Sequence, residues 1–136
     1  MVANLEYDST LSKRNIYNIY GALINKETVC EGYSRAFKAV MDDLNIPCVI
    51  ACGSAVNSSD EIENHAWNYV RLDNKWYAVD VTWDDPIIVG SGYVIGKFNY
   101  KYYLKGSNDF FKNHTENGDV VSDAGFKYPT LSYDNY

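Results

Sequence analysis

The sequence predicts a single domain of the α+β class, in which helices accompany an antiparallel sheet. Residues 31–46 repeat apolar side chains at the spacing of one helix face. Residues 64–83 form two runs rich in aromatic and β-branched residues on either side of the polar pair Asp73-Asn74, which predicts a hairpin. With 136 residues and 46% hydrophobic content, the chain is long and apolar enough for one folded core.

An amphipathic core helix is predicted over residues 10–27. Ser9 or Thr10 suits its start, because a hydroxyl there accepts a hydrogen bond from a first-turn backbone N–H. The apolar residues at helical spacing are Leu11, Ile16, Ile19, Tyr20, Leu23 and Ile24. We expect this helix to pack beside the next one.

The next helix has Cys30 in its first turn. Its apolar face consists of Tyr33, Phe37, Val40, Met41 and Leu44. Glu31 suits a first turn, because a helix N-terminus favours negative charge. Asn45 and Pro47 mark the far end.

An apolar strand that ends near Ala55 and a polar loop over residues 56–64 follow this helix. The loop is expected to border the candidate site, where it either admits substrate or is a solvated connection. Cys48 and Cys52 lie in the strand about 13 Å apart, beyond disulfide reach. Both are predicted to be core thiols.

The register of the hairpin follows from its turn. If Asp73 and Asn74 are the two turn residues, Leu72 faces Lys75. His65 and Asp80 then share one face of the sheet as diagonal neighbours, roughly 7–8 Å apart at the backbone. Two side chains can close that gap, whereas a one-residue slip would put them on opposite faces.

Further strands or a loop beside the site are predicted for residues 87–104, and a short helix near residues 107–112. His114 is a competing candidate for a catalytic base. It lies in the polar, turn-rich run NHTENGD, so it is predicted to be a surface histidine.

Cys30, His65 and Asp80 together have the chemistry of a nucleophile, a general base and a carboxylate that orients the base. A thiol at its reference pKa of about 8.5 is only a few per cent thiolate at neutral pH. A neighbouring imidazolium and a helix N-terminus both favour the thiolate. Singly, each residue has an ordinary alternative: a buried small residue, a structural histidine and a turn former at a strand end.

Composition excludes several other classes. The net charge of −6 disfavours nucleic acid or an anionic membrane as the main partner, because phosphate contacts need clustered Lys and Arg. No apolar run approaches the roughly 18–20 residues of a membrane span. Cys48, Cys52 and His114 lack the paired short spacings of a zinc site, so neither a metal nor a cofactor is predicted.

The runs VCEGYSRAF, HAWN and KWYAVDVTWDDP closely resemble the transglutaminase-like superfamily, particularly its bacterial branch. The resemblance spans roughly residues 9–103, with weaker echoes in YKYYLKGSNDFF and FKYPTL. It implies a papain-like α+β fold, with the nucleophile helix packed against an antiparallel sheet. Cys30 would be the nucleophile, His65 the base and Asp80 the orienting acid, and residues 83–86 would form a tight structural exit from the strand.

The implied activity is acyl transfer on protein or peptide amides through a thioester. An amine acceptor would make the protein a transglutaminase, whereas water would make it a deamidase or a peptidase. Two alternatives remain open. One is a catalytically silent binding or scaffolding module of a larger protein, and the other is a purely structural domain.

The resemblance also bears on the context of residues 1–136. We expect one transglutaminase-like domain that is a fragment of a larger protein, with other domains of the parent chain as neighbours. Similar bacterial domains favour a secreted or cell-surface location.

Overall fold

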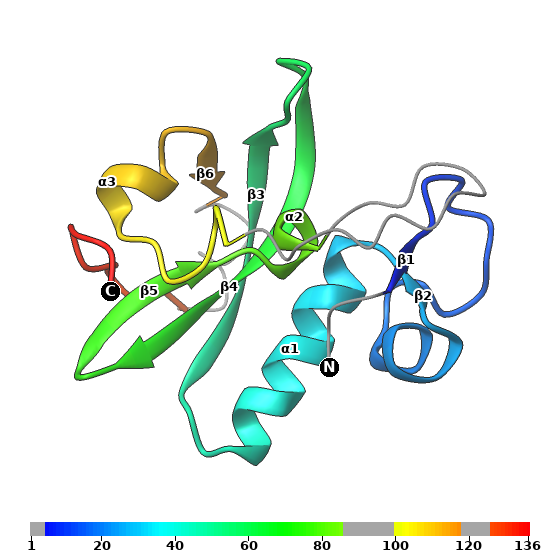
Figure 1. The fold of residues 1–136 in the computed structure, drawn as a ribbon, viewed down its shortest axis with the longest axis horizontal. Helices are drawn as coiled ribbons and strands as arrows, with labels where there is room; N and C mark the ends of the chain where they lie inside the picture. Colours follow the sequence, from blue (N-terminus) through cyan, green and yellow to red (C-terminus); the bar gives the residue numbers. More distant parts are fainter. Residues whose placement is uncertain (1–4, 86–99, 118–125) are drawn as a thin grey trace.

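A computed structural model describes residues 5–85, 100–117 and 126–136 of the chain (Figure 1). In chain order the helices and strands are β1 (Glu6–Tyr7), the π-helix η1 (Gly21–Asn25), β2 (Glu27–Thr28), α1 (Cys30–Asp43), β3 (Cys48–Val56), β4 (Ile62–Leu72), β5 (Lys75–Val79), α2 (Val81–Asp84), α3 (Ser107–Phe110) and β6 (His114–Glu116).

The main sheet has the strand order β5-β4-β3-β6, and all neighbouring strands in it are antiparallel. Leu72 pairs with Lys75, so the predicted hairpin register is confirmed. Asp73 and Asn74 have φ values of 47° and 63°. Positive φ at both central positions is the requirement of a tight hairpin turn whose twist matches that of the strands.

Both faces of this sheet are covered. Helix α1 contacts β4 and β3 on one face, where Phe37 and Met41 pack against a cluster that includes Val70 and Val79. Helix α3 and the C-terminal segment cover the opposite face (Figure 1). The buried residues on this opposite face are Ala51, Trp67, Tyr69, Ala78, Tyr102, Phe110 and Leu131. The predicted α+β class, with a helix packed against an antiparallel sheet, is confirmed.

The amphipathic helix predicted over residues 10–27 is wrong for most of its length. Turns occupy the first part, and the short π-helix η1 begins only at Gly21. Leu11 and Asn15 have φ values of 54° and 70°, in a region that interrupts a right-handed helix. Gly21 approaches this turn so closely that an added Cβ would lie 2.2 Å from the Asn15 carbonyl oxygen. Tertiary contact therefore overrides the helical periodicity.

The second hairpin strand is shorter than predicted, because β5 ends at Val79 and residues 81–84 form α2. The Asp80 carboxylate accepts hydrogen bonds from the backbone N–H groups of Thr82 and Trp83. This N-cap starts a helix where the apolar pattern alone favoured a strand.

The short helix near residues 107–112 is confirmed as α3, although it ends earlier. Most of the segment predicted as strands or a loop, residues 87–104, lies outside the described residues. The predicted loop over residues 56–64 is confirmed only in its middle, because β3 extends to Val56 and β4 begins at Ile62.

Cys30, Cys48 and Cys52 are free thiols. Cys48 is buried as predicted, but Cys52 is exposed, so the prediction of a second core thiol is wrong. Ala51 faces the core cluster on one side of the sheet, so alternation puts Cys52 on the same face as Cys48, but near Glu31 at the start of α1, where it is exposed. None of the helices in the described ranges has the length and apolar character of a membrane-spanning segment.

Candidate active site

The thiol of Cys30 lies at the start of α1, as predicted, and is partly exposed. The preceding N-cap residue is Val29, whose side chain makes no capping hydrogen bond. Backbone N–H groups of this first turn therefore lack a side-chain cap and carry the positive end of the helix dipole. Gly32 lets the turn form close to β2, because an added Cβ there would lie 1.8 Å from the Thr28 hydroxyl oxygen.

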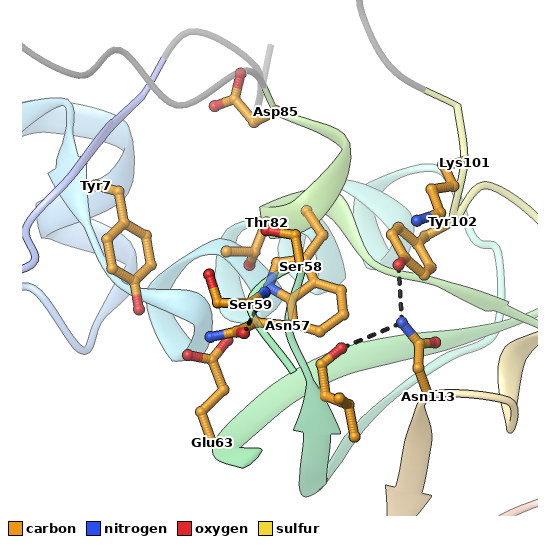
Figure 2. Close-up of a pocket in the computed structure, with 12 residues that line it drawn as sticks. Tyr7, Asn57, Ser58, Ser59, Glu63, Thr82, Asp85, Lys101, Tyr102 and Asn113 are labelled. Carbon is orange, nitrogen blue, oxygen red and sulfur yellow. Dashed lines mark hydrogen bonds between the residues drawn. The ribbon is translucent and has the colours of Figure 1, made fainter. Parts of the chain in front are cut away.

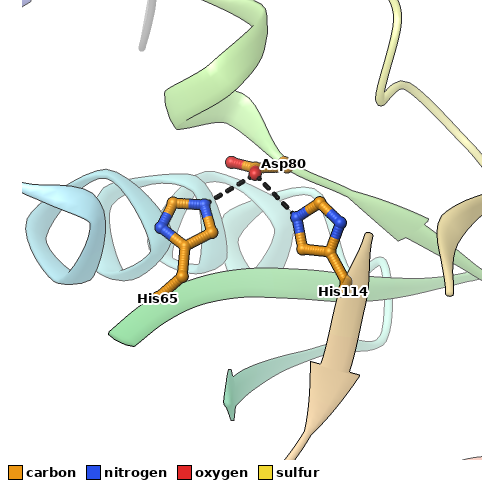
Figure 3. A group of neighbouring side chains, drawn as sticks. All are labelled: His65, Asp80 and His114. Atoms are coloured by element: carbon orange, nitrogen blue, oxygen red, sulfur yellow. Dashed lines mark hydrogen bonds and ion pairs between the residues drawn. The ribbon is translucent and has the colours of Figure 1, made fainter. Parts of the chain in front are cut away.

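His65 and Asp80 meet as the hairpin register predicts. His65 Nε2 lies 2.7 Å from Asp80 Oδ2 (Figure 3). Both side chains are buried, with residue exposures of 5% for His65 and 0% for Asp80. Since a carboxylate oxygen accepts, Nε2 of His65 carries the hydrogen, and Nδ1 is the nitrogen that remains for Cys30.

Asp80 is held as a carboxylate although it is fully buried. Its Oδ1 accepts from Thr82 N at 3.1 Å and Trp83 N at 3.2 Å, while Oδ2 accepts from histidine nitrogens. Burial raises the pKa of Asp80, but the charge of His65 and the hydrogen bonds from His114 and His65 outweigh burial and lower it. A buried carboxylate is tolerated when hydrogen bonds satisfy both of its oxygens, as they do here.

Burial alone would lower the pKa of His65, but its interactions with Asp80 and Cys30 raise the pKa by more. The charge and hydrogen bond of Asp80, followed by hydrogen bonding and charge interaction with Cys30, raise the pKa of His65 to about 10. The protonated ring is therefore favoured between a carboxylate and a thiol. This is the electrostatic setting in which a thiolate and an imidazolium stabilise each other.

His114 is not a surface residue, and that prediction is wrong. Its exposure is 1%, and its Nε2 lies 3.2 Å from the same oxygen, Asp80 Oδ2 (Figure 3). The reason is long-range: β6 pairs with β3, with His114 opposite Ala55, and this pairing turns the ring inward. No local signal in the polar run around it distinguishes this arrangement from a turn.

Residues after Asp80 connect the site to the rest of the fold. Trp83 stacks on the His65 ring at a centroid distance of 4.7 Å. Asp85 Oδ2 accepts from Tyr33 Oη at 2.8 Å and from Leu5 N at 3.2 Å. Asp84 Oδ1 accepts from the Tyr102 backbone N–H, and burial followed by the Asp80 charge raises the pKa of Asp84 to about 7. These contacts agree with a structural role for residues 83–85, while Pro86 lies outside the described residues.

A cavity of about 640 Å³ lies next to this group, and Trp83 belongs both to its wall and to the His65 stack. Tyr7 and Glu63 lie toward one end of it, with Lys101 and Asn113 toward the other (Figure 2). The remaining lining residues are Val56, Asn57, Ser58, Ser59, Thr82, Asp85 and Tyr102. The loop predicted to border the site therefore contributes to its wall.

Thr82 gives this cavity an unsatisfied polar group. The residue is 4% exposed and its Oγ1 has no hydrogen-bond partner among the described residues. A buried hydroxyl without a partner costs stability, and this one lies beneath the wall of the cavity.

His65, Asp80 and His114 are also the described residues that could hold a metal ion, since their donor atoms all lie within 4.8 Å of one another. Each histidine Nε2 is, however, at hydrogen-bond distance from Asp80 Oδ2, and a metal would require both nitrogens to present lone pairs instead. The hydrogen bonds therefore account for the cluster without an ion.

Three comparisons relate the chain to known proteins. A sequence profile of the transglutaminase-like superfamily matches residues 1–81. The kyphoscoliosis peptidase of Mus musculus is 29% identical over 122 residues, and that of Homo sapiens is 28% identical over 119 residues. Each alignment covers 79% of this chain but 17% of the relative. The chain thus spans about a sixth of the length of these relatives, and the predicted bacterial branch remains a prediction.

Two solved structures are similar in outline. A TGase has a TM-score of 0.49 at 18% identity, covering 74% of this chain and 28% of the other. A proposed cysteine protease from Cytophaga hutchinsonii has a TM-score of 0.46 at 21% identity, covering 58% of this chain and 27% of the other.

Proposed function

We propose that this chain, which belongs to the transglutaminase-like superfamily, is a cysteine-dependent enzyme. It would transfer acyl groups from protein or peptide amides through a thioester. The observation that carries the proposal is the 2.7 Å contact between His65 Nε2 and Asp80 Oδ2, which leaves Nδ1 of His65 for Cys30. The interaction of Cys30 with His65 supports the same pairing.

The chemistry follows from these positions. The Cys30 thiolate attacks the amide carbonyl carbon, a C–S bond forms, and the carbonyl oxygen gains the negative charge. The backbone N–H of Cys30, in the first turn of α1, is a donor for that oxyanion. When the C–N bond breaks, protonated His65 gives its proton to the departing nitrogen, which leaves a thioester and a neutral imidazole.

The acceptor decides the product. Water activated by His65 hydrolyses the thioester, whereas an amine forms a new amide bond. The substrate would lie in the cavity whose wall includes Trp83, the residue stacked on His65. Deamidation, peptide cleavage and cross-linking share this first half-reaction.

The test measures the alkylation rate of Cys30 by iodoacetamide between pH 5 and pH 9, in the wild-type protein and in His65→Gln. We expect selective reaction of Cys30 well below pH 8, and a fall of about 100-fold at pH 6 in His65→Gln, because a free thiol is mostly protonated there. Asn64→Gln, at an exposed neighbouring position on β4, should behave like the wild type.

Cys48 and Cys52 are internal controls. Burial raises the pKa of Cys48 to about 11, and partial desolvation of the largely exposed Cys52, followed by the charge of Glu31, raises the pKa of Cys52. If Cys30 reacts no faster than a free thiol, the domain is a silent binding or scaffolding module instead. A positive result leads to screening of glutamine-containing peptides for ammonia release, amine incorporation and cleavage.

A further inference from the structure

The second histidine on the Asp80 carboxylate has no place in the mechanism above. Strand β6 brings it there from the opposite edge of the sheet, through pairing of Ala55 with His114. Its side chain has 0% exposure, and its Nε2 lies 3.2 Å from Asp80 Oδ2. Figure 3 shows the two imidazole rings approaching the carboxylate from different strands, β4 and β6.

The hydrogen on His114 Nε2 is fixed by its partner. A carboxylate oxygen accepts only, so Nε2 of His114 donates, as does Nε2 of His65. Asp80 Oδ1 already accepts from the backbone N–H groups of Thr82 and Trp83. Asp80 is thus surrounded by donors, two on each oxygen, and cannot rotate without losing at least one of them.

Aromatic packing holds the His114 ring in this orientation. Phe110 stacks on it at a centroid distance of 4.0 Å and an interplanar angle of 20°. The rings of Trp67 and Tyr102 meet it edge to face at 5.0 Å and 5.3 Å. On its other side, Nδ1 lies 2.9 Å from Asn113 Oδ1. Nε2 is therefore aimed at one point, and that point is the oxygen that also holds His65.

We propose that His114 is a positioning residue, whose Nε2–H fixes the Asp80 carboxylate so that His65 is held through Nε2 and presents Nδ1 to Cys30. The inference rests on the proposed function, because it assigns His114 to the chemistry of Cys30 and His65. It differs from a packing role in requiring the N–H group, and not only an aromatic ring, at this position.

The charge balance around Asp80 gives the expected pH effect. The groups that act on Asp80 are His65, His114, Asp84 and Tyr7, and Cys30 acts on it through His65. The hydrogen bond and charge of His114 are among the causes that lower the pKa of Asp80 against the opposing effect of burial. Without that donor the carboxylate takes up a proton at higher pH, so the acid limb of Cys30 reactivity should move upward.

The experiment compares two variants in the full chain. His114→Phe keeps a ring against Phe110 and removes both nitrogens, whereas His114→Gln keeps an N–H donor near the position of Nε2. Phe110→Leu is the packing control, because it loosens the ring stack and leaves the His114 nitrogen in place. Two readouts are used: the pH dependence of Cys30 alkylation by iodoacetamide, and the proton NMR signal and water exchange of His65 Nε2–H.

We expect His114→Phe to alkylate about tenfold more slowly at pH 6, since a hydrogen bond to a charged group is lost. Its acid limb should lie at higher pH, and its His65 Nε2 proton should exchange faster with water. His114→Gln and Phe110→Leu should stay within about threefold of the wild type.

Wild-type alkylation and an unchanged His65 proton in folded His114→Phe would overturn the proposal. So would a loss in Phe110→Leu as large as that in His114→Phe, because looser packing alone would then explain both. If His114→Phe does not fold, His114→Leu takes its place, since it also lacks the N–H donor and is compared with His114→Gln in the same way. A wild-type Cys30 with ordinary thiol reactivity refutes the proposed function, and the His65 proton still reports whether His114 positions Asp80.

Discussion

The two histidines of the site contact the same oxygen of Asp80, but they lie on different strands and have different second partners. His65 lies on β4 beside Cys30, with the indole of Trp83 stacked on it. His114 lies on β6, and its second nitrogen faces Asn113 instead of a thiol. Position relative to the nucleophile, and not contact with Asp80, therefore separates a candidate base from a positioning residue.

Asp80→Asn should lower Cys30 reactivity more than His114→Phe does, because Asp80 contacts both histidines. Each oxygen of Asp80 accepts from two donors, so an amide placed at either oxygen sets N–H groups against N–H groups. We expect Cys30 alkylation at pH 6 to fall roughly 30-fold, through a misplaced histidine as in the serine-protease triad. Stability should fall by about 1–3 kcal/mol, as read from urea unfolding.

Asp109→Asn is the matched control for this change. Asp109 pairs with Lys112 on the surface of α3, and exposed pairs contribute about 0–1 kcal/mol. Wild-type alkylation in Asp80→Asn would mean that the carboxylate does not orient His65 for the chemistry of Cys30.

Gly53→Ala tests the contribution of β6 to the site without replacing the His114 side chain. Gly53 pairs with Glu116 on β6, and an added Cβ would lie 2.0 Å from the Thr115 carbonyl oxygen. The strand must shift, at a cost of about 1–3 kcal/mol. We expect Cys30 alkylation at pH 6 to fall about threefold, because part of the His114 hydrogen bond is lost. Cys52→Ala, an exposed neighbour, should leave both quantities unchanged.

The stability of the fold at high pH isolates the contribution of His65. The pKa of His65 rises from 6.5 to about 10 on folding, so the protonated ring stabilises the fold fully below pH 6.5. That contribution is lost as the pH rises through about 10. Urea unfolding of the wild type and His65→Gln should therefore show a stability difference that narrows from pH 6 to pH 10. A stability difference that stays constant from pH 6 to pH 10 would mean that folding does not raise the pKa of His65.

Asp80 behaves in the opposite sense at low pH. Its pKa is lowered below 3.8 in the folded protein, so its contribution is present above that value and is lost as the pH falls through the lower, folded pKa. Urea unfolding of the wild type and Asp80→Asn below pH 4 therefore reports on Asp80, because Asp8 and Asp109, whose pKa values are also lowered, contribute to both proteins.

Much of the site follows from local sequence. The turn at Asp73-Asn74 set the register of the hairpin, and strand alternation then brought His65 and Asp80 onto one face. The apolar spacing after Cys30 likewise located the start of α1. The catalytic roles of these three residues remain predictions.

The failures share a cause. Residues 10–27 have helical periodicity, but contacts of Ile16 and Gly21 with β2 impose a turn-rich path. Val81 and Trp83 have the composition of a strand, but the Asp80 side chain caps a helix there. In each case a contact that a pattern does not encode competes with local propensity and wins.

Local sequence is enough to predict the helix that carries Cys30 and the hairpin that joins His65 to Asp80, because both depend on short-range periodicity and one turn. The position of His114 beside them depends instead on long-range packing. Strand β6 spans three residues, and its pairing with β3 closes a long stretch of chain. Such pairing depends on the burial of the whole sheet face, including Phe110 and Trp67, and a polar run of three residues carries no local trace of it.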